Sequence, residues 1–411
     1  MSELSYLEKL MDGVEVEWKA VGDIAGYSTT KVDADKLDAT SFVGVDNLLA
    51  DKGGRIDATY QPNTARLTAY EPGDILLGNI RPYLKKVWMA ENNGGCSGDV
   101  LAIRILADCK KIISPEYLYY ALSSDSFFSY SMQHAKGAKM PRGSKDAILN
   151  YQIPIPCPSA PEKSLAIQSE IVRILDKFTA LTAELTAELN MRKKQYNYYR
   201  DQLLTFKEGE VEWKALGEIG EVRMCKRILK SQTSSEGEIP FYKIGTFGKE
   251  PDSYISRKLF NEFKEKYSYP KVGEVLISAS GTIGRTVIFD GRESYFQDSN
   301  IVWIENNEKI VLNKYLFYFY KIAKWGISEG GTIKRLYNDN LRKLMIPVPF
   351  PDSPERSLVE QQKIVKLLDK FDALTNSITE GLPREIELRQ KQYEYYRDLL
   401  FSFPKPDTVS N

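Results

Sequence analysis

Apolar residues recur at helical spacing in two long stretches of the chain. In the first stretch they alternate steps of four and three, and the pattern continues into an aromatic end: Ile167, Ile171, Ile174, Phe178, Leu181, Leu185, Leu189, Tyr196, Tyr199, Leu203 and Phe206. This spacing predicts a coiled-coil seam. The phrase TAELTAEL at 182–189 adds two successive steps of four, which locally relax a supercoil. The second stretch contains Gly381 and Pro383, which we expect to weaken or kink its helix.

Short alternating runs precede each of these helices. GDILL at 73–77, LAIRI at 101–105 and NIVWI at 300–304 are bounded by Gly, Asp and Asn, a pattern typical of strands joined by turns. PEYLYYALSS at 115–124 predicts a local helix. The proline-rich phrases at 153–163 and 346–356 cannot be helix interior and indicate the exits from two α+β domains.

The sequence contains an internal repeat. VEWKAVGDI at 16–24 returns as VEWKALGEI at 211–219, and QYNYYRDQLLTF at 195–206 returns as QYEYYRDLLFSF at 392–403. The repeating unit is thus roughly 195 residues long. Segments 25–69 and 220–268 share almost nothing, although matching landmarks flank both. A duplicated scaffold with divergent surfaces is the simplest interpretation.

The repeat predicts a domain order along the chain. We expect a short N-terminal helix at 1–13, a mixed, β-rich domain at 14–158, a long helix at 159–206, a second domain at 207–351, a second long helix at 352–403 and a flexible tail at 404–411. A helix of about 43 residues is about 65 Å long. Antiparallel pairing of the two helices would hold the domains at opposite ends of a rod.

Composition narrows the possible functions. The 411 residues are 42% apolar and 27% charged, which indicates an ordinary soluble chain. The start lacks a signal-peptide pattern and no run is long enough to span a membrane, so we expect a cytoplasmic protein. Four cysteines without a CxxC pair, and His134 as the single histidine, argue against zinc and histidine-based catalysis. Zero net charge leaves room for basic patches.

Catalytic motifs are missing from the sequence. It contains no GxxxxGK[ST] phosphate loop and no NPP[FY] motif of the kind that amino-methyltransferases use. No residue spacing singles out a paired-carboxylate or Ser/Lys site, so a stand-alone enzyme is disfavoured. A coiled-coil scaffold without DNA readout stays open as the alternative to a DNA-binding protein.

Several ordered motifs resemble one family. VEWKxxGDI, the GD(I/V)L strand, SASGTIGRTVI at 278–288, the IPxP exit, the QxxIVxxLD helix start and the TAEL tetrads are similar to the specificity (S) subunit of type I restriction–modification enzymes, subclass IC. The resemblance covers nearly the whole chain. It implies two target recognition domains that each read part of a bipartite double-stranded DNA site. It also implies two conserved helices that dock two methyltransferase (M) subunits, with restriction (R) subunits joining them.

The same resemblance implies that this chain is not catalytic. S-adenosylmethionine, ATP and Mg²⁺ would then belong to the partner subunits, with no cofactor or metal bound by this chain.

Basic and hydroxyl side chains in the divergent segments are the candidate DNA contacts. Two runs, 137–145 and 330–335, lie at equivalent places just ahead of the exits, although any single run could be a solvated face. The first-domain candidates are Arg81, Lys85, Lys136, Lys139, Arg142 and Lys145. The second-domain candidates are Arg223, Lys226, Arg227, Ser280, Thr282, Arg285, Thr332, Lys334 and Arg335.

The duplicated YYRD phrase supplies the candidate docking residues. Tyr199 and Tyr396 fall on the seam and are expected in the core, whereas aromatic side chains on other faces can anchor a subunit interface. The docking candidates are Tyr196, Tyr198, Arg200, Tyr393, Tyr395 and Arg397.

The two TAEL tetrads at 182–189 allow a test of whether the length of the first helix sets the gap between the half-sites. Four residues add about 6 Å of rise and about 40° of rotation, whereas one DNA base pair adds about 3.4 Å and about 34 to 36°. Deleting Thr186–Leu189 should therefore shorten the gap between half-sites by about one base pair, with tilt or bending absorbing the remaining rise. Sequencing of methylated sites measures the gap. An unchanged gap with full activity, or altered half-site bases, contradicts this role of the helix, and the same edit beside Gly381 should act less cleanly.

Overall fold

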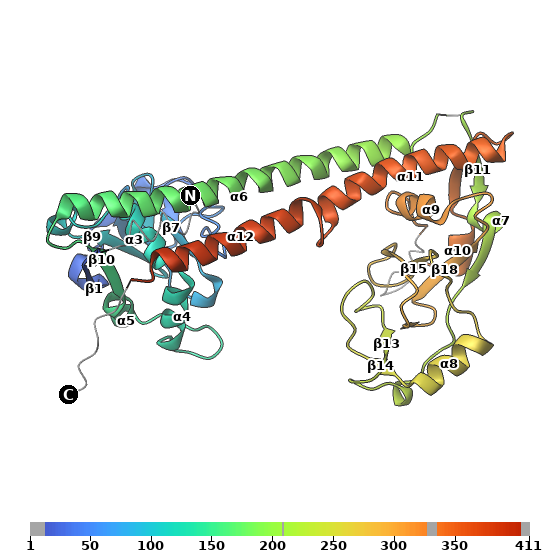
Figure 1. Cartoon of the computed structure of the whole chain (residues 1–411), viewed down its shortest axis with the longest axis horizontal. Helices are drawn as coiled ribbons and strands as arrows, with labels where there is room; N and C mark the ends of the chain where they lie inside the picture. The colour runs from blue at the N-terminus through green and yellow to red at the C-terminus, as the bar shows by residue number, and fades with distance from the viewer. Residues whose placement is uncertain (1–12, 208, 327–334, 404–411) are drawn as a thin grey trace. The chain divides into compact units, whose positions relative to one another are not determined.

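The structure is a computed structural model that describes residues 13–207, 209–326 and 335–403 (Figure 1). It divides into two compact units. Unit 1 combines residues 1–185 with 386–411, and unit 2 contains residues 186–385. The expected N-terminal helix, apart from Gly13, and the expected C-terminal tail lie outside the described residues.

Among the residues that the structure describes, the globular part of unit 1 contains three sheets and four α-helices. Strand β1 pairs antiparallel with the exit strand β10, the central sheet has the order β2-β9-β6-β7, and a further sheet has the order β3-β5-β8-β4. The strands are β1 (Val16–Ala20), β2 (Ala25–Tyr27), β3 (Lys31–Asp33), β4 (Phe42–Val43), β5 (Arg66–Tyr70), β6 (Ile75–Gly78), β7 (Val87–Met89), β8 (Gly94–Cys96), β9 (Val100–Ile105) and β10 (Gln152–Pro156). The helices are α2 (Val21–Ile24), α3 (Pro115–Leu122), α4 (Asp125–Gln133) and α5 (Lys145–Asn150).

The globular part of unit 2 repeats this frame. Its sheets have the orders β11-β19, β12-β18-β15-β16 and β14-β13-β17. The strands are β11 (Val211–Ala215), β12 (Gly220–Arg223), β13 (Ile239–Tyr242), β14 (Tyr254–Ile255), β15 (Val275–Ser278), β16 (Thr286–Ile288), β17 (Tyr295–Phe296), β18 (Ile301–Asn306) and β19 (Met345–Pro349). The helices are α7 (Leu216–Ile219), α8 (Arg257–Lys266), α9 (Asn313–Tyr320) and α10 (Asn338–Arg342).

The proline-rich exits are strands as well as exits. Trp18 of β1 lies opposite Pro154 of β10, and Trp213 of β11 lies opposite Pro347 of β19. Proline lacks a donor and is confined to edge strands, and each of these two-stranded sheets consists of edge strands only. Each domain is therefore closed by pairing its first strand with its last.

The long helices are α6 (Pro161–Leu203), α11 (Pro354–Asn376) and α12 (Gly381–Leu400). The second arm is interrupted after Asn376, which confirms the expected effect of Gly381. Gly381 has a φ of 77°, and a Cβ there would lie 2.4 Å from the Ala373 carbonyl oxygen. Only glycine fits the backbone at this interruption.

Within each unit, the start of one long helix lies beside the end of another, running antiparallel (Figure 1). In unit 1, Phe178 of α6 stacks on Tyr396 of α12 with ring centroids 5.3 Å apart. In unit 2, Phe371 of α11 stacks on Tyr199 of α6 with centroids 5.7 Å apart. The two stacked pairs come from equivalent positions of the repeat.

The first turns of the predicted seam pack on the globular domain. Ile167 and Ile171 of the predicted seam are buried in the core cluster of unit 1, together with residues of α3 and β10, whereas the predicted Ile174 is partly buried there. Leu181, also predicted to lie in the seam, is 37% exposed. The regular spacing therefore marks two successive contacts, first with the domain and then with a second helix.

A buried glutamine near the start of α6 and of α11 fastens each of these two helices to its domain. The Gln168 amide donates to Ile112 O at 2.7 Å, and its oxygen accepts from Ser114 N–H at 3.0 Å. The Gln361 amide likewise donates to Ile310 O at 3.0 Å, and its oxygen accepts from Leu312 N–H at 2.9 Å. Gln168 and Gln361 are both fully buried.

Replacing Gln361 should destabilise unit 2. Gln361→Met leaves the partly buried Ile310 carbonyl and Leu312 N–H without this partner, at up to about 1 to 3 kcal/mol each. Urea unfolding followed by tryptophan fluorescence measures the change. Lys363→Met, on the exposed side of the same helix, is the control and should change the free energy of unfolding by about 0.5 kcal/mol or less. Equal effects of the two substitutions would refute the fastening role.

Candidate DNA interface

In both units, the loop after the central strand is bridged to the segment ahead of the exit strand. In unit 1, Ile80 bridges to Arg142, and Arg81 N–H donates to Pro141 O at 2.7 Å. In unit 2, Ser280 bridges to Arg335, and Leu336 N–H donates to Ala279 O at 2.8 Å. Each unit therefore joins its two predicted DNA-contacting segments into one edge, which we call the loop edge.

The loop edge of unit 1 ends in a small hairpin. Lys136 N–H donates to Arg142 O at 2.9 Å, and Arg142 N–H donates to Lys136 O at 2.8 Å. Gly137, with a φ of 101°, allows the chain to turn between them. Lys136, Lys139 and Arg81 have exposed side chains. The hairpin therefore presents cations to solvent.

Asp99 orients the arginine of this hairpin. Arg142 Nη1 lies 2.9 Å from Asp99 Oδ1, and the arginine side chain stays 57% exposed. The Asp99 carbonyl also accepts from Asn79 N–H at 2.8 Å, which fixes the neighbouring loop. Arg142 is thus held in place while its outer face stays in water.

Two first-domain candidates face elsewhere. Lys85 Nζ lies 2.7 Å from Asp125 Oδ1, so its charge is already paired inside the unit. Lys145 is exposed, and its Nζ lies 5.8 Å from the centre of the Tyr27 ring. The structure corrects the expectation for Lys85, because its amine is paired and its side chain is only 33% exposed, whereas the paired Arg142 stays 57% exposed.

The turn 298–300 gathers three second-domain candidates. Arg227 Nε lies 3.0 Å from Asp298 Oδ2, and Arg335 donates to Ser299 O at 3.1 Å. Ser280 Oγ lies 2.8 Å from Asn300 Oδ1, to which it donates. Ser299 in this turn adopts a φ of 59°. Arg227, Ser280 and Arg335 therefore form one cluster.

The glycine-rich loop 280–285 completes this edge. Arg285 donates to Phe247 O at 3.0 Å, and Thr282 is exposed. Gly284 has a φ of 82°, and a Cβ there would lie 2.1 Å from Trp325 Nε1. The loop can approach Trp325 only because residue 284 is glycine.

Two further second-domain candidates, Arg223 and Lys226, make other contacts. Arg223 pairs with Glu221 at 2.7 Å and with Glu305 at 2.9 Å, on strands β12 and β18. Lys226 Nζ lies 5.0 Å from the centre of the Tyr267 ring. Thr332 and Lys334 lie outside the described residues. The predicted stretch from Arg223 to Arg227 therefore contributes mainly its last residue.

The docking candidates separate into exposed and buried side chains. Tyr198 and Tyr395 are 61% and 58% exposed, in keeping with a surface role. Tyr196 is 5% exposed and packs in the core of unit 2, and Arg397 is fully buried. Both placements correct the expectation that these two side chains meet a partner.

The other residues of the duplicated phrase are partly covered. Burial raises the pKa of Tyr393 to about 12, as the ring packs against the core of unit 1. The Arg200 guanidinium lies 5.7 Å from the centre of the Tyr196 ring and 2.7 Å from Asp201. Tyr199, expected in the core, is 45% exposed although it stacks on Phe371.

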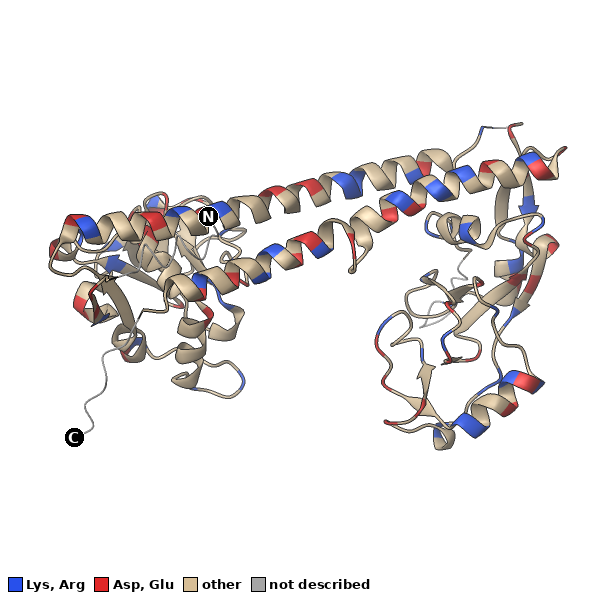
Figure 2. Cartoon of the chain, in the orientation of Figure 1, with Lys and Arg blue, Asp and Glu red and all other residues tan. Residues whose placement is uncertain are grey.

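Charges of both signs alternate along α6, α11 and α12 (Figure 2). Local pairs such as Glu188 with Arg192 and Glu387 with Lys391 join successive turns. Such i,i+4 pairs support an exposed helix surface. The basic residues of the helices thus lie among acidic partners on a regular surface. The exposed lysines of the loop edge in unit 1 lie on a glycine-containing hairpin instead.

Sequence reasoning missed the acidic and amide residues that orient the loop edges. Asp99 and Asn300 both stand directly before a core strand, and each carbonyl accepts from the loop after the central strand, at 2.8 Å and 2.7 Å. Aligning SGDV at 97–100 with DSNI at 298–301 would have paired these two positions.

Comparison with known proteins gives the family. The family model "Type I restriction modification DNA specificity domain" matches residues 72–192 and 208–388. The chain therefore belongs to the family of type I restriction–modification specificity proteins.

Relatives resemble this chain over nearly its whole length. It is 48% identical to a Haemophilus influenzae protein described as a type I restriction enzyme specificity subunit, over 97% of this chain and 98% of that one. It is 42% identical to the Escherichia coli EcoR124I/EcoR124II specificity subunit over the full length of both. The Escherichia coli EcoprrI specificity subunit is 34% identical over 92% of this chain and 93% of its own length.

Solved structures share the fold. A chain from a study of complex assembly and conformational transition of the type I R-M system has a TM-score of 0.57 at 18% identity, covering 94% of this chain and 97% of that one. The S subunit of a type I system from M. genitalium has a TM-score of 0.55 at 14% identity, covering 96% of this chain and 98% of that one.

The described part of the chain contains neither a membrane-spanning helix nor a cluster of metal ligands. Among residues 13–207, 209–326 and 335–403, no helix is long and apolar enough to cross a membrane. The same ranges hold no group of three or more His, Cys, Asp or Glu side chains placed to bind a metal ion.

Lys139 offers a direct test of the loop edge in unit 1. Lys139→Ala should weaken DNA binding by the assembled complex equally for all sequences and lower the slope of log K against log salt by about 0.9. Lys111, an exposed lysine next to Ile112 at the long-helix contact, is the matched control and should leave the slope unchanged. Equal slopes for wild type and Lys139→Ala would remove the hairpin from the DNA surface.

Proposed function

We propose that this chain is the DNA-recognition subunit of a type I restriction–modification complex in which each domain reads one half of a bipartite site. The observation that carries the proposal is the duplicated loop edge. The bridges Ile80 to Arg142 and Ser280 to Arg335 join equivalent segments, yet the side chains on the two edges differ. An edge with the same frame and different chemistry suits two different half-sites.

The chemistry of the edges fits duplex DNA. Exposed Lys136 and Lys139 can neutralise phosphates, which contributes affinity without sequence preference. Arg142 and Arg335 have a planar fork that can bind the N7 and O6 acceptors of guanine. Their partners Asp99 and Ser299 hold these forks before DNA arrives, so less side-chain freedom is lost on binding.

The long helices provide the surface for methyltransferase subunits. Tyr198 and Tyr395 stand at equivalent positions of the repeat and are both largely exposed. Tyrosines of this kind anchor protein interfaces because they bury a large apolar area and keep one hydroxyl. Two equivalent tyrosines suit two copies of one partner, and restriction subunits join that core.

The chemistry of modification and cleavage belongs to the partners. We assign S-adenosylmethionine to the methyltransferase subunits, and ATP and Mg²⁺ to the restriction subunits. This chain contributes position: it places the target base at the partner's active site by fixing which DNA sequence the complex holds. A coiled-coil scaffold is the competing function, and DNA sequence preference distinguishes the two.

Exchanging one domain tests the proposal. Residues 14–158 are replaced by the corresponding segment of a relative, and methylated sites are mapped by sequencing in cells that carry the partner subunits. One half-site should change, while the other half-site and the gap stay the same. Methylation at unchanged sites, or at sites altered in both halves, contradicts the assignment of one domain to one half-site.

Activity of the isolated chain gives a second test. The purified chain should neither methylate nor cut DNA, and methylation should appear when methyltransferase subunits and S-adenosylmethionine are added. Incorporation of a labelled methyl group measures both states. Methyl transfer by the chain alone would falsify the division of labour.

A further inference from the structure

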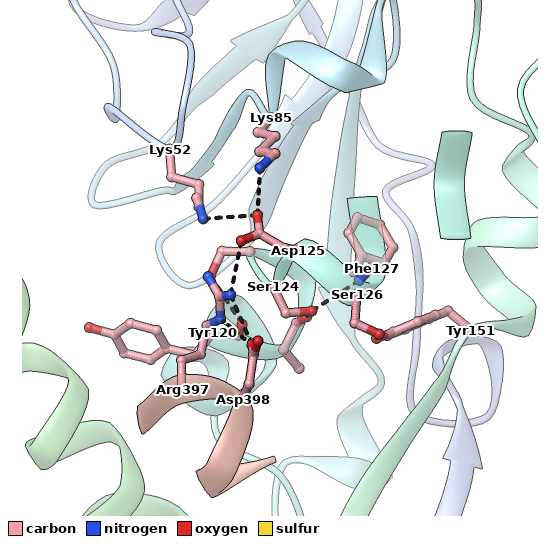
Figure 3. A network of polar contacts seen from close by, with 12 residues as sticks. Lys52, Lys85, Tyr120, Ser124, Asp125, Ser126, Phe127, Tyr151, Arg397 and Asp398 are labelled. Atoms are coloured by element: carbon pink, nitrogen blue, oxygen red, sulfur yellow. Dashed lines mark hydrogen bonds and ion pairs between the residues drawn. The ribbon is translucent and has the colours of Figure 1, made fainter. Parts of the chain in front are cut away.

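An arginine from α12 is buried beneath the first domain. Arg397 has no exposed side-chain area, and its Nη2 lies 3.1 Å from Asp125 Oδ2 and 2.9 Å from Asp398 Oδ1 (Figure 3). Asp125 is the first residue of α4, so this contact joins the long helix to the globular domain within unit 1. A guanidinium taken out of water in this way requires paired acceptors.

Asp125 also forms ion pairs with two lysines of the domain. Lys85 Nζ lies 2.7 Å and Lys52 Nζ 3.3 Å from Asp125 Oδ1 (Figure 3). Burial opposes ionisation of Asp125, but the hydrogen bond from Lys85 and the charges of Lys52 and Arg397 hold its pKa well below the usual range. One carboxylate thus holds three cations from three segments of the chain.

The two lysines stand on loops that are tied to each other. Lys52 N–H donates to Lys85 O, and Asp51 N–H donates to Leu84 O, both at 2.9 Å. Lys52 and Lys85 adopt φ values of 63° and 50°. Non-glycine residues hold such a conformation only when surrounding contacts impose it.

This tied loop leads directly to the loop edge. Arg81, four residues before Lys85, donates its N–H to Pro141 O of the hairpin and has a φ of 53°. Residues 81–85 form a short turn around Pro82–Leu84. The loop is therefore held at one end by the Asp125 network and at the other end by the hairpin.

The second unit has a different arrangement at the equivalent place. Tyr117 donates to Pro154 O and Tyr315 donates to Pro347 O, which aligns α3 with α9. In this alignment Ala323 occupies the position of Asp125, and no carboxylate is present there. Arg200, the counterpart of Arg397, pairs with its neighbour Asp201.

We propose that Arg397 and Asp125 are positioning residues for DNA reading by the first domain. Together with Lys52 and Lys85 they set the loop 79–85, and hence the loop edge of unit 1, relative to α12. This inference rests on the proposed function, since it assumes that the loop edge contacts DNA. It makes a residue of the helix arm a determinant of one half-site only.

The experiment uses the complex of this chain with its methyltransferase subunits. Binding is measured for a duplex with both half-sites, and for duplexes with one base pair changed in either half-site. One changed pair typically lowers affinity about 5- to 150-fold. Arg397→Met should reduce this discrimination at least about tenfold at the half-site of the first domain, which the domain exchange identifies, and leave it intact at the other.

Lys111→Met, at an exposed lysine of unit 1 outside this network, is the control and should leave discrimination at both half-sites as in the wild type. Unchanged discrimination in Arg397→Met, or equal loss at both half-sites, overturns the inference. A wild-type complex without half-site discrimination would instead overturn the proposed function. The two failures are therefore distinguishable.

Further variants guard against simple misfolding. Arg397→Lys keeps the charge but lacks the fork, so it should lose discrimination at the first half-site while the complex still assembles. Asp125→Asn combined with Arg397→Met should lose no more discrimination than the worse single variant, because both residues act through one contact. Additive losses would count against the network.

Lys85→Met separates positioning from phosphate binding. Because Asp125 already pairs the Lys85 amine, the slope of log K against log salt should match the wild type, while discrimination at the first half-site falls. A slope smaller by about 0.9 would mean that Lys85 is itself a phosphate ligand and would overturn its place in the network.

Discussion

The buried glutamine at the start of each helix arm is the contact on which the rest of the structure depends. Gln168 and Gln361 connect the helix to the backbone just before α3 and α9, where each amide donates to one carbonyl, of Ile112 or Ile310, and accepts from one N–H, of Ser114 or Leu312. A buried amide satisfied on both sides tolerates few alternative geometries. The same pair of hydrogen bonds therefore fixes the direction of α6 relative to its domain in unit 1 and of α11 relative to its domain in unit 2.

The two domains share their backbone pairing and differ in the side chains at the loop edges. The strand pairs β1–β10 and β11–β19 keep the same register, and the loop edges keep the same backbone bridge. What changes is the side-chain chemistry at the bridge: the ion pair of Arg142 with Asp99 in one unit, and the hydrogen bond of Ser280 with Asn300 in the other. Backbone hydrogen bonds do not depend on side-chain identity, so such an edge can vary without loss of the fold.

Local patterns predicted the elements well because each carries its own signal. Proline marked the exits, alternation marked β9 and β18, and Gly381 marked the break between α11 and α12. Helical periodicity could not tell the domain contact of Ile167 and Ile171 from a helix–helix contact, since both need an apolar stripe. Strand pairing of β10 also escaped prediction, because proline is rare in strands and its partner lies more than a hundred residues away.

The candidate site was predicted at the level of segments rather than side chains. The basic phrases around Arg81 and Arg142 do meet, but Lys85 turns inward because Asp125, forty residues further on, is placed beside it only by tertiary structure. A run of basic residues shows where charges lie in the sequence. It does not show which of them are paired, because the partners can come from distant parts of the chain.

The duplicated YYRD phrase shows how far identical sequence can diverge in role. Arg200 and Arg397 follow the same aromatic residues at the end of a helix, yet Arg397 is buried against Asp125 whereas Arg200 pairs with its neighbour Asp201. The difference comes from the domain rather than the helix, because the domain supplies Asp125 in one unit and Ala323 in the other. The first domain thus gives Arg397, a residue of the duplicated helix, a positioning role that its counterpart Arg200 lacks. Tyr198 and Tyr395 are exposed at equivalent positions of the two helices, although the arginines two residues further on make different contacts.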